Sequence, residues 1–350
     1  MLSRLSDEWL AAGHAVRFVV YVRLYEPFYY ATDAPVVVID ADGDEVAATD
    51  LPPDGGQPAP ASFGDHARAT LALGRYLRRR TRPEQLVLAN HSFTVGPVLR
   101  SPARCKFYYI QAYEPEYYAT RPGLLPKVKS LYAGLSYRLP IRRIVNTPTY
   151  ARYLPRLGRD PVVAPGLDLG VYYPGPRRKL REGRIRIGFV SRVEVEKGTR
   201  ESLEAVERLA AEDSRVDVDV ALDNLGRASS LERLTITPIT CDEDLAEYYR
   251  GLDIVIAPIS AQFGAPHYPA WEALACGTPL VTTDVMLCDD RNSWRCAPGS
   301  AESIYGVLRE VIAADAAVIG AKIEAGLATA RRQEWTTVAQ RFLDIFAACT

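Results

Sequence analysis

Two cationic side chains on one short loop carry the clearest chemical signal in the sequence. Arg192 and Lys197 follow an apolar, β-branched run that ends at Ser191, and they precede a helical pattern that begins near Thr199. A guanidinium fork, an ammonium group and the start of a helix all attract anions. The loop is therefore predicted to bind the oxygens of a diphosphate. An ordinary solvated basic loop is the alternative interpretation.

A second segment, residues 263–279, predicts a short helix whose start faces a ligand. Pro269 suits the first helical position and Gly277 the C-terminal cap, which would place Glu272 in the first turn. A carboxylate there can accept hydrogen bonds from a ribose diol, while amides of the preceding loop face phosphate or sugar. An acidic residue favoured by the helix dipole alone is the alternative. The other residues assigned to the same ligand are Ser191, at the end of the first run, and the loop residues Gly264, Ala265, His267 and Tyr268.

The length and composition of the chain are those of a two-domain protein. Its 350 residues exceed what one hydrophobic core usually organises, and 48% of them are apolar and 24% charged. A net charge of -1 offers no long-range attraction to nucleic acid, so no nucleic-acid partner is expected. The scattered cysteines favour reduced, mostly buried thiols over a zinc cage or a disulfide framework. Without a signal peptide or a run of about 18 apolar residues, we expect a cytoplasmic protein, at most peripheral to the inner face of a membrane.

Short β-branched runs alternate with longer amphipathic stretches along the whole chain. This alternation is typical of parallel sheets covered by helices, and two sets of about five strands predict two doubly wound α/β domains. The strands expected in the first half span residues 16–22, 35–40, 86–90, 107–110 and 144–146. Those expected in the second half span residues 184–191, 216–222, 234–238, 253–258 and 279–283.

Chain breakers and then charged residues between 162 and 183 mark a hinge between the halves. We therefore predict one domain over residues 1–165, a second over 166–330 and a C-terminal segment over 331–350. That segment predicts a helix that docks on a neighbouring surface. Its apolar residues at helical spacing are Trp335, Val338, Phe342 and Phe346.

The first half contains two unusual segments. It opens with a helical pattern over residues 3–13, where a doubly wound sheet normally opens with a strand. Either a first strand lies outside the sequence or this domain begins atypically. In addition, residues 25–32 are nearly repeated at 113–120, and each copy follows a predicted strand. Both copies could lie at the carboxyl edge of the sheet, where ligands bind, or they could share a loop shape whose tyrosines pack.

The same edge of the first half carries the candidate residues for a second substrate. His91 follows a predicted strand and is interpreted as a site residue rather than a core histidine, because that edge is the usual ligand crevice. The acceptor-side candidates are Asn90, His91, Gln111, Tyr113 and Glu114.

Taken together, these motifs resemble the family 4 retaining glycosyltransferases, whose GT-B fold has two Rossmann-like domains facing a cleft. The resemblance covers nearly the whole second half. It rests on Arg192, Lys197 and Gly198, on Phe263 and Gly264, on Glu272 and Ala273, on residues 276–279, on residues 165–168 and 172–174, and on residues 245–249 running into 253–258. It implies an N-terminal acceptor domain, a C-terminal nucleotide-sugar donor domain and a final helix that packs back on the first domain.

The resemblance also implies roles for individual residues. Arg192 and Lys197 would bind the donor diphosphate and Glu272 the ribose, while His91 would line the cleft. The protein would stabilise charge on the diphosphate, and the leaving diphosphate would accept the proton of the acceptor. On this basis the catalytic residues are His91, Arg192 and Lys197. The family's later His-Asp pair falls at Gln111 and Ala112, which supply no titrating base.

Two stretches of sequence bear on the identity of the donor sugar. The family's earlier glutamate is replaced by Gly264, and residues 267–269 are instead similar to a rhamnosyltransferase-like branch. Residues 111–115 match that branch in the first half except at Ala112. The resemblance therefore implies a deoxysugar donor such as dTDP-rhamnose.

These observations predict a hexosyltransferase of polysaccharide biosynthesis with a glycan, lipid-linked or small-molecule acceptor. No Asp-x-Asp motif lies at a strand end before a phosphate loop, and the basic pair can replace a cation, so we expect no metal and no cofactor. Two alternatives stay open: a non-catalytic, nucleotide-sugar-binding partner subunit, and another enzyme on the same fold, such as a sugar-nucleotide epimerase or a phosphorylase.

Residues 124–143 interleave basic and apolar side chains. The basic residues are Lys127, Lys129, Arg138, Arg142 and Arg143. The apolar ones are Leu124, Leu125, Leu131, Tyr132 and Leu135. This pattern suits a surface that touches anionic lipid, but a helix with one core face and one solvated face is the favoured interpretation.

Overall fold

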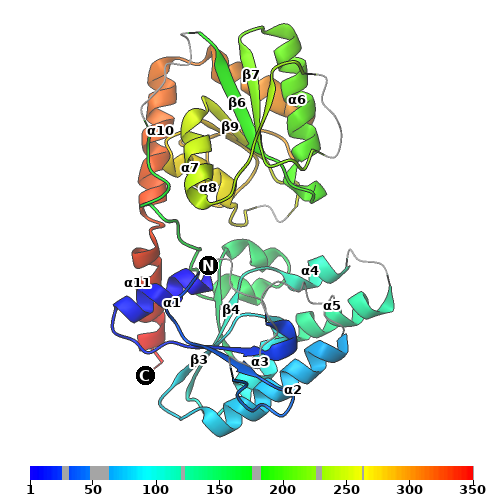
Figure 1. Cartoon of the computed structure of the whole chain (residues 1–350), viewed down its shortest axis with the longest axis vertical. Coiled ribbons are helices and arrows are strands. Elements are labelled where there is room, and N and C mark those ends of the chain that lie inside the picture. Colours follow the sequence, from blue (N-terminus) through cyan, green and yellow to red (C-terminus); the bar gives the residue numbers. More distant parts are fainter. Residues whose placement is uncertain are drawn as a thin grey trace. The chain divides into compact units, whose positions relative to one another are not determined.

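The computed structural model describes residues 1–25, 31–47, 63–119, 123–175, 183–225, 231–261 and 264–349. The chain forms two compact units (Figure 1). The first unit comprises Met1–Ala164 and Trp335–Thr350, and the second comprises Pro165–Glu334. Each unit has its own parallel sheet structure and its own buried clusters, which confirms the predicted α/β class.

In its described residues the first unit has five strands, in two parallel sheets. In one sheet, β1 (Phe18–Tyr21) pairs with β2 (Val36–Ile39). In the other, β3 (Leu86–Ala89), β4 (Cys105–Ile110) and β5 (Arg142–Val145) follow one another in chain order. Five strands were expected in a single sheet. Among the described residues no ladder joins β1 to β3, although both sheets contribute to one buried cluster.

Helices cover both faces of the β3–β4–β5 sheet. Along β4, Phe107 and Tyr109 belong to one buried cluster, while Tyr108 and Ile110 belong to another, as the alternation of side chains in a strand requires. The first cluster includes residues of α1 (Leu2–Ala11) and α11 (Trp335–Ala347), and the second includes residues of α2 (Phe63–Arg80) and α3 (Ser92–Leu99). The remaining helices of this unit are α4 (Glu114–Ala119), α5 (Leu124–Ser136) and the short 3-10 turns η1 (Val22–Leu24), η3 (Pro148–Arg152) and η4 (Pro155–Arg159).

The amino-terminal and carboxy-terminal helices pack against each other within the first unit. The ring of Phe342 on α11 meets Trp9 of α1 with centroids 5.7 Å apart and Tyr109 of β4 at 4.9 Å, both edge to face. Phe346 lies 5.0 Å from Phe107 by the same measure. The apolar spacing noted in the sequence therefore corresponds to a helix whose aromatic face is buried against β4.

A disulfide joins Cys105, at the start of β4, to Cys349, just after α11. The expectation that all the cysteines are reduced thiols is therefore wrong for this pair. Cys105 points to the same face of β4 as Phe107, and α11 covers that face, so the two sulfurs meet although 244 positions separate them in sequence. Four other cysteines are free thiols: Cys241, Cys276, Cys288 and Cys296.

The second unit is built on one parallel sheet with the strand order β11-β10-β9-β6-β7-β8. Its strands are β6 (Ile185–Val190), β7 (Val216–Ala221), β8 (Leu234–Thr237), β9 (Ile254–Ala257), β10 (Leu280–Thr282) and β11 (Trp294–Arg295). Helices α6 (Thr199–Glu212) and α9 (Ala301–Ala313) pack together, as do α8 (Tyr268–Ala275) with α7 (Asp242–Gly251) and with α10 (Ala316–Arg331). In Figure 1, α6 and α10 flank this sheet on opposite sides.

The strand predictions agree closely with the structure of both units. Each of the ten expected runs contains or overlaps one observed strand, because β-branched runs between breakers are a strong strand signal. The strand that was missed is β11, which is only two residues long. None of the helices in the described part of the chain has the length and apolar character needed to cross a membrane.

Candidate functional site

The loop after β6 holds its cationic residues in a fixed backbone frame. Because β6 is an interior strand, its carboxyl end lies at the middle of the sheet edge, where ligands bind in parallel α/β folds. The backbone N–H of Arg192 donates to Thr199 Oγ1 at 2.8 Å, and the Thr199 hydroxyl donates to the Arg192 carbonyl at 2.9 Å. The start of α6 therefore fixes the position of Arg192.

Gly198 permits the sharp turn from the short 3-10 helix η5 (Val195–Lys197) into α6. Its φ is +67°, in the left-handed region that favours glycine. A Cβ at this position would lie 2.7 Å from Cγ of Pro258, at the end of the neighbouring β9. The backbone must therefore approach Pro258 closely, and this approach brings the end of the loop against the sheet edge.

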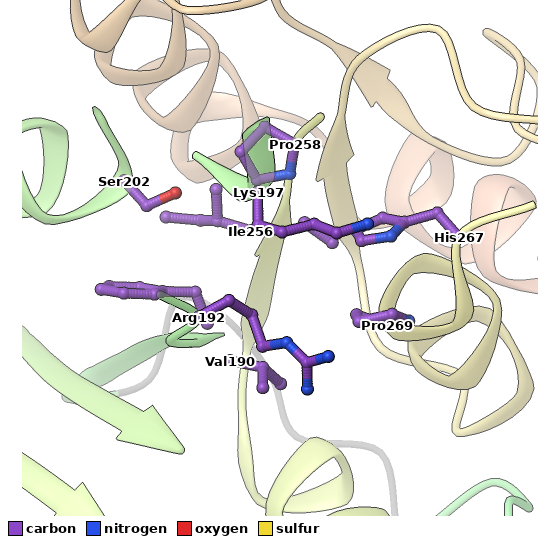
Figure 2. A pocket seen from close by; sticks show the side chains of 10 residues that line it. Val190, Arg192, Lys197, Ser202, Ile256, Pro258, His267 and Pro269 are labelled. Atoms are coloured by element: carbon purple, nitrogen blue, oxygen red, sulfur yellow. The ribbon is translucent and has the colours of Figure 1, made fainter. Parts of the chain in front are cut away.

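Three of the predicted donor-site residues line one pocket: Arg192, Lys197 and His267. Its other walls come from the ends of β6 and β9 and from the starts of α6 and α8, namely Phe189, Val190, Ser202, Ile256, Ala257, Pro258 and Pro269. In Figure 2 the Lys197 side chain runs toward the His267 ring, and the Arg192 side chain extends beside them. Two separate loops thus bring a guanidinium, an ammonium and an imidazole to the same opening.

The charges at this pocket are strongly biased toward anion binding. His267 is 6% exposed, and burial together with the cations Lys197 and Arg192 lowers its pKa to about 3, so the imidazole is neutral at pH 7. Burial and the neighbouring Arg192 also lower the pKa of Lys197. The nearest counter-charge to Arg192 is Glu194, whose Oε2 lies 3.7 Å from Nε in a half-exposed pair. An incoming anion would relieve the repulsion between the two cations.

Glu272 lies on the same helix as His267 but deeper than the sequence indicated. Helix α8 begins at Tyr268, before Pro269, so Glu272 is the fifth helical residue and the prediction of a first-turn position is wrong. The cause is His267, which takes the extended N-cap conformation and lets the next residue start the helix. Glu272 is 8% exposed and is absent from the pocket wall.

The Glu272 carboxyl group is held by two tyrosines. The Tyr249 hydroxyl donates to Oε2 at 3.0 Å, and Tyr172 also hydrogen-bonds the carboxyl group. Burial raises the pKa of Glu272 to about 7, although these hydrogen bonds act in the opposite direction. A group with this pKa is divided between its neutral and charged forms near pH 7, so a ligand that donates hydrogen bonds to it can decide its protonation state.

The other predicted donor-side residues have structural contacts of their own. The Ser191 hydroxyl is buried and accepts the backbone N–H of Asn224 at 2.9 Å, which ties β6 to the segment after β7. The Gly264 N–H donates to the Asp284 carbonyl at 2.7 Å, and the Ala265 carbonyl accepts from Met286. Tyr268 is half-buried beside Trp271. The pocket wall contains none of the four predicted residues Ser191, Gly264, Ala265 and Tyr268.

Ser202 is a pocket residue that the sequence did not reveal. Its side chain is 1% exposed, and its hydroxyl has no hydrogen-bond partner among the described residues (Figure 2). An unsatisfied hydroxyl inside a protein is unfavourable, so its presence on a pocket wall suggests that a ligand completes it. Nothing in the sequence separates this serine from any other residue in the first turn of a helix.

A second polar cluster lies in the first unit, at the carboxyl ends of β3 and β4. His91 caps α3. Its ring Nδ1 accepts the backbone N–H of Phe93 at 3.3 Å, while the backbone N–H of His91 donates to Thr94 Oγ1. His91 Nε2 lies 3.4 Å from Oε2 of Glu114 and 3.4 Å from the Tyr118 hydroxyl. Its side chain is 41% exposed, so the imidazole remains open to solvent.

Glu114 is the centre of this cluster. Its carboxylate accepts the backbone N–H of Ser92 at 3.0 Å, the Ser92 hydroxyl at 2.5 Å and the Tyr108 hydroxyl at 3.3 Å. The sequence assigned His91 and Glu114 to the same side and the structure brings them together. The sequence analysis missed Ser92, Tyr108 and Tyr118, because the sequence gave no sign that their hydroxyls converge on Glu114 and His91.

The remaining acceptor-side candidates have other surroundings or contacts. Asn90 is exposed directly after β3. The Gln111 carbonyl accepts Asn146 Nδ2 and the Tyr150 hydroxyl, so its backbone has a structural role. Tyr113 is stacked on Tyr153 with centroids 4.2 Å apart, as the packing interpretation of the near-repeat expected. Residues 26–30 of the first copy, Thr120 of the second and Phe263 lie outside the described residues.

The second unit contains a sequence match to a known family. Residues 184–314 match the model of the glycosyl transferases group 1 family. A D-inositol 3-phosphate glycosyltransferase of Paenarthrobacter aurescens is 32% identical over 171 residues, which cover 41% of each chain. One of a Mycobacterium species (strain KMS) is 37% identical over 168 residues, covering 41% of this chain and 37% of the relative. The chain thus spans about two fifths of the length of the curated relatives it matches.

Solved structures resemble the chain over nearly its whole length. Sucrose-phosphate synthase from Thermosynechococcus elongatus superposes with a TM-score of 0.71 at 16% identity, covering 99% of this chain and 93% of that one. HepE from Anabaena in complex with UDP gives a TM-score of 0.67 at 17% identity, with 99% and 96% covered. These similarities show the fold, which is the predicted two-domain GT-B fold, while residues 184–314 match the group 1 glycosyl transferase family.

Proposed function

We propose that the chain is a glycosyltransferase that takes a sugar from a nucleoside diphosphate donor, with retention of configuration. The observation that carries this proposal is the pocket wall shared by Arg192, Lys197 and the neutral His267. Two cations at the carboxyl edge of a parallel sheet suit a diphosphate, and their acidic neighbours are Glu194 and Glu196. The match of residues 184–314 to group 1 glycosyl transferases supports the same donor class.

The chemistry follows from where negative charge develops. When the bond between the anomeric carbon and the diphosphate oxygen breaks, charge grows on the diphosphate, and fixed cations stabilise it in the transition state. Arg192 and Lys197 act in this way. In retaining transfer the new bond forms on the same face of the sugar, and the leaving diphosphate oxygen accepts the proton of the acceptor hydroxyl. This route requires no nucleophilic side chain.

The reaction is proposed to be independent of metal ions. The usual role of a divalent cation at a diphosphate is to neutralise developing charge, and the basic pair performs that role here. The aspartates of residues 217–219, which could suggest a metal motif, are instead paired with Arg184 and Arg186 across the sheet. Turnover that is unchanged by a chelator would agree with this proposal, whereas loss of turnover restored by Mg²⁺ would contradict it.

Glu272 is proposed to bind the ribose of the donor. Its carboxylate accepts hydrogen bonds from two hydroxyl donors already, and a ribose diol would add donors of the same kind. Glu272→Gln should therefore weaken binding of the nucleoside diphosphate by about tenfold, the loss expected for one hydrogen bond to a charged group. The 2′,3′-dideoxy analogue should bind both proteins equally. Equal weakening of both ligands would remove Glu272 from the ribose site.

Separate features support the proposals for the donor sugar and for the acceptor. The resemblance of residues 267–269 to a rhamnosyltransferase-like branch favours a deoxysugar such as rhamnose, while the curated relatives are named D-inositol 3-phosphate glycosyltransferases. We assign the acceptor to the first unit, where His91 and Glu114 offer an open imidazole beside a half-buried carboxylate. A glycan, a lipid-linked sugar or a small polyol would present the hydroxyl that this pair can hydrogen-bond.

Calorimetric titration of nucleoside diphosphates, without added metal, tests the proposal first. One diphosphate should bind, and Arg192→Ala and Lys197→Ala should each weaken it by more than tenfold, since each removes a charge-assisted contact. Arg200→Ala is the matched control, because Arg200 is an exposed cation in the next turn. Failure of every diphosphate to bind the intact protein would refute the donor site.

Turnover assays separate the alternatives. A glycosyltransferase consumes the donor only when an acceptor is present, beyond slow hydrolysis. An epimerase converts the donor without an acceptor. A partner subunit binds the diphosphate but shows turnover only with a second protein, and that result would replace the catalytic proposal by a binding one.

A further inference from the structure

Helix α5 of the first unit exposes the side chains that a soluble helix normally buries. Leu124 is 79% exposed, Leu131 is 66% exposed and Leu135 is 51% exposed. Val128 and Leu125 are exposed as well. Positions 124, 128, 131 and 135 are spaced by four, three and four residues, so these side chains form one continuous stripe along the helix.

The opposite side of α5 faces the protein. Its buried residues are Ala133 and Ser136, and the helix packs on α3 and α4 (Figure 1). Ser136 donates its hydroxyl proton to the carbonyl of Ala133, and the half-buried Tyr132 stacks on Phe93 of α3. Ala133, Ser136 and the Tyr132 ring therefore make the protein contact, while the leucines face outward. The helix has one face on the protein and one toward solvent, as the favoured interpretation from sequence expected, but its leucines lie on the solvent face.

An outward leucine stripe of this length needs a physical explanation. Burial of apolar area is the main favourable term in folding, and single exposed apolar residues are common, but a contiguous stripe marks an interaction surface. Positions 124 to 135 span about 17 Å along the helix axis. The interleaved basic and apolar residues of this segment were compatible with leucines that face the core. In the structure, these leucines do not contribute to a buried core.

The charges around the stripe indicate the chemistry of its partner. Lys127 is exposed three residues after Leu124 and four before Leu131, so it flanks the stripe. Arg138 is exposed just after the end of α5, and residues 123–138 contain no acidic residue. Beyond the end of α5, burial and the charges of Arg143 and Arg138 lower the pKa of the Arg156 guanidinium, while Asp160, which pairs with Arg143, acts in the opposite direction. The exposed cation at this end of the stripe is Arg138.

We propose that α5 is the docking surface of this protein for an anionic lipid bilayer. The leucine stripe would lie in the boundary between headgroups and acyl chains, and Lys127 and Arg138 would contact anionic headgroups. Basic groups beside an apolar stripe match a bilayer surface, whereas a protein partner with an apolar groove would not require the excess of positive charge. This surface belongs to the first unit and does not depend on the proposed donor site.

Co-sedimentation of the full-length protein with lipid vesicles tests the inference. Wild-type protein should bind vesicles of phosphatidylglycerol and phosphatidylcholine in equal parts, and binding should weaken as salt is raised. The double variant Leu124→Gln with Leu131→Gln should lose at least about tenfold in affinity. Lys127→Gln with Arg138→Gln should lose about fivefold per charge, and only on anionic vesicles.

Leu71→Gln is the matched control. Leu71 is 60% exposed on α2 of the same unit but stands outside the stripe, so its substitution should leave vesicle binding unchanged. The thermal midpoint of each variant should equal that of the wild type, because every changed side chain is exposed. The inference is overturned if the wild type does not bind anionic vesicles, or if Leu71→Gln weakens binding as much as the stripe variants. It is also overturned if light scattering shows a dimer that only the stripe variants dissociate, which would make a second copy the partner.

Discussion

At the scale of single residues, the proposed donor pocket and the residues around it combine groups that are satisfied by the protein with groups that are not. Thr199, Ser191 and Glu272 have protein partners, whereas Ser202 has none among the described residues. The sequence could indicate the cations, because Arg and Lys at a strand end are unusual enough to notice. It could not indicate Ser202, because its significance depends on what its hydroxyl fails to contact.

Ser202→Ala should separate ligand binding from stability. Its hydroxyl makes no hydrogen bond in the described structure, so the substitution should leave the free energy of unfolding unchanged or raise it slightly. Diphosphate affinity should fall by about tenfold, because a hydrogen bond to a charged group is lost. Titration calorimetry and denaturant unfolding measure the two quantities.

Ser300→Ala is the contrasting control for that experiment. The Ser300 side chain caps α9 by accepting the backbone N–H of Ser303 at 3.1 Å. Its loss should cost about 1 kcal/mol of stability and leave diphosphate binding intact. If Ser202→Ala behaves like Ser300→Ala, the Ser202 hydroxyl has a structural partner and is no part of the donor site.

Glu272→Gln should change the pH dependence of stability. The pKa of Glu272 rises from 4.5 in the unfolded chain to about 7 in the fold, so between these values the folded state binds a proton that the unfolded state has released. The contribution of this group to stability therefore falls as pH rises from 4.5 to 7 and stays low above it. Glutamine carries no such penalty and keeps an oxygen for the Tyr249 hydroxyl.

The variant should gain stability over the wild type as pH rises. The difference in the free energy of unfolding should be near zero at pH 4 and reach up to about 3 kcal/mol in favour of Glu272→Gln at pH 8. Urea unfolding at the two pH values measures it. A difference that does not change with pH would mean that the Glu272 carboxyl group titrates alike in the folded and unfolded states.

At the scale of elements, the loop from β6 to α6 depends on the backbone of one glycine. Gly198→Ala should destabilise the protein by about 1 to 3 kcal/mol, because an alanine must adopt a φ of +67° and its Cβ meets Pro258. Diphosphate binding should weaken too, since Lys197 directly precedes this residue. Thermal unfolding and calorimetry report the two effects.

Gly299→Ala isolates the contact with Pro258. Gly299 has nearly the same φ, +66°, but no atom lies within 4 Å of the position of its Cβ. The two variants share the backbone strain, so only Gly198→Ala adds the clash and the effect on binding. Equal destabilisation by both, with unchanged binding, would show that Pro258 moves away and that the close approach is dispensable.

The elements also show what sequence patterns can and cannot specify. Runs such as 216–222 predicted strands well, because a β-branched run between breakers has few other solutions. The orientation of α5 was not predictable, because the spacing of its leucines defines a face but not the surface that this face meets. The start of α8 was misplaced for a similar reason: Pro269 suits either of the first two helical positions, and the extended His267 decides between them.

At the scale of the whole molecule, contacts between residues distant in sequence were the hardest feature to predict. Cys105 and Cys349 belong to distant parts of the chain, and the intervening residues include the complete second unit. Their pairing depends on α11 packing on β4, which apolar spacing alone did not reveal. In contrast, the division into two α/β units followed from chain length and from two sets of strands, which are properties of the sequence as a whole.

The separate cores of the two units predict two unfolding transitions with different sensitivities. The disulfide lies in the first unit and the proposed diphosphate pocket in the second, so a thiol reductant and a nucleoside diphosphate should act on different transitions. In scanning calorimetry, diphosphate at about 100 times its Kd should stabilise the second unit's transition by about 2.7 kcal/mol.

Reductant should lower the stability of the first unit by about 2 to 5 kcal/mol, the usual contribution of a native disulfide. Cys349→Ser should already show the lowered transition and ignore the reductant, because the remaining cysteines are free thiols. A single transition that responds to both agents would contradict independent cores and would mean that the units unfold as one cooperative body.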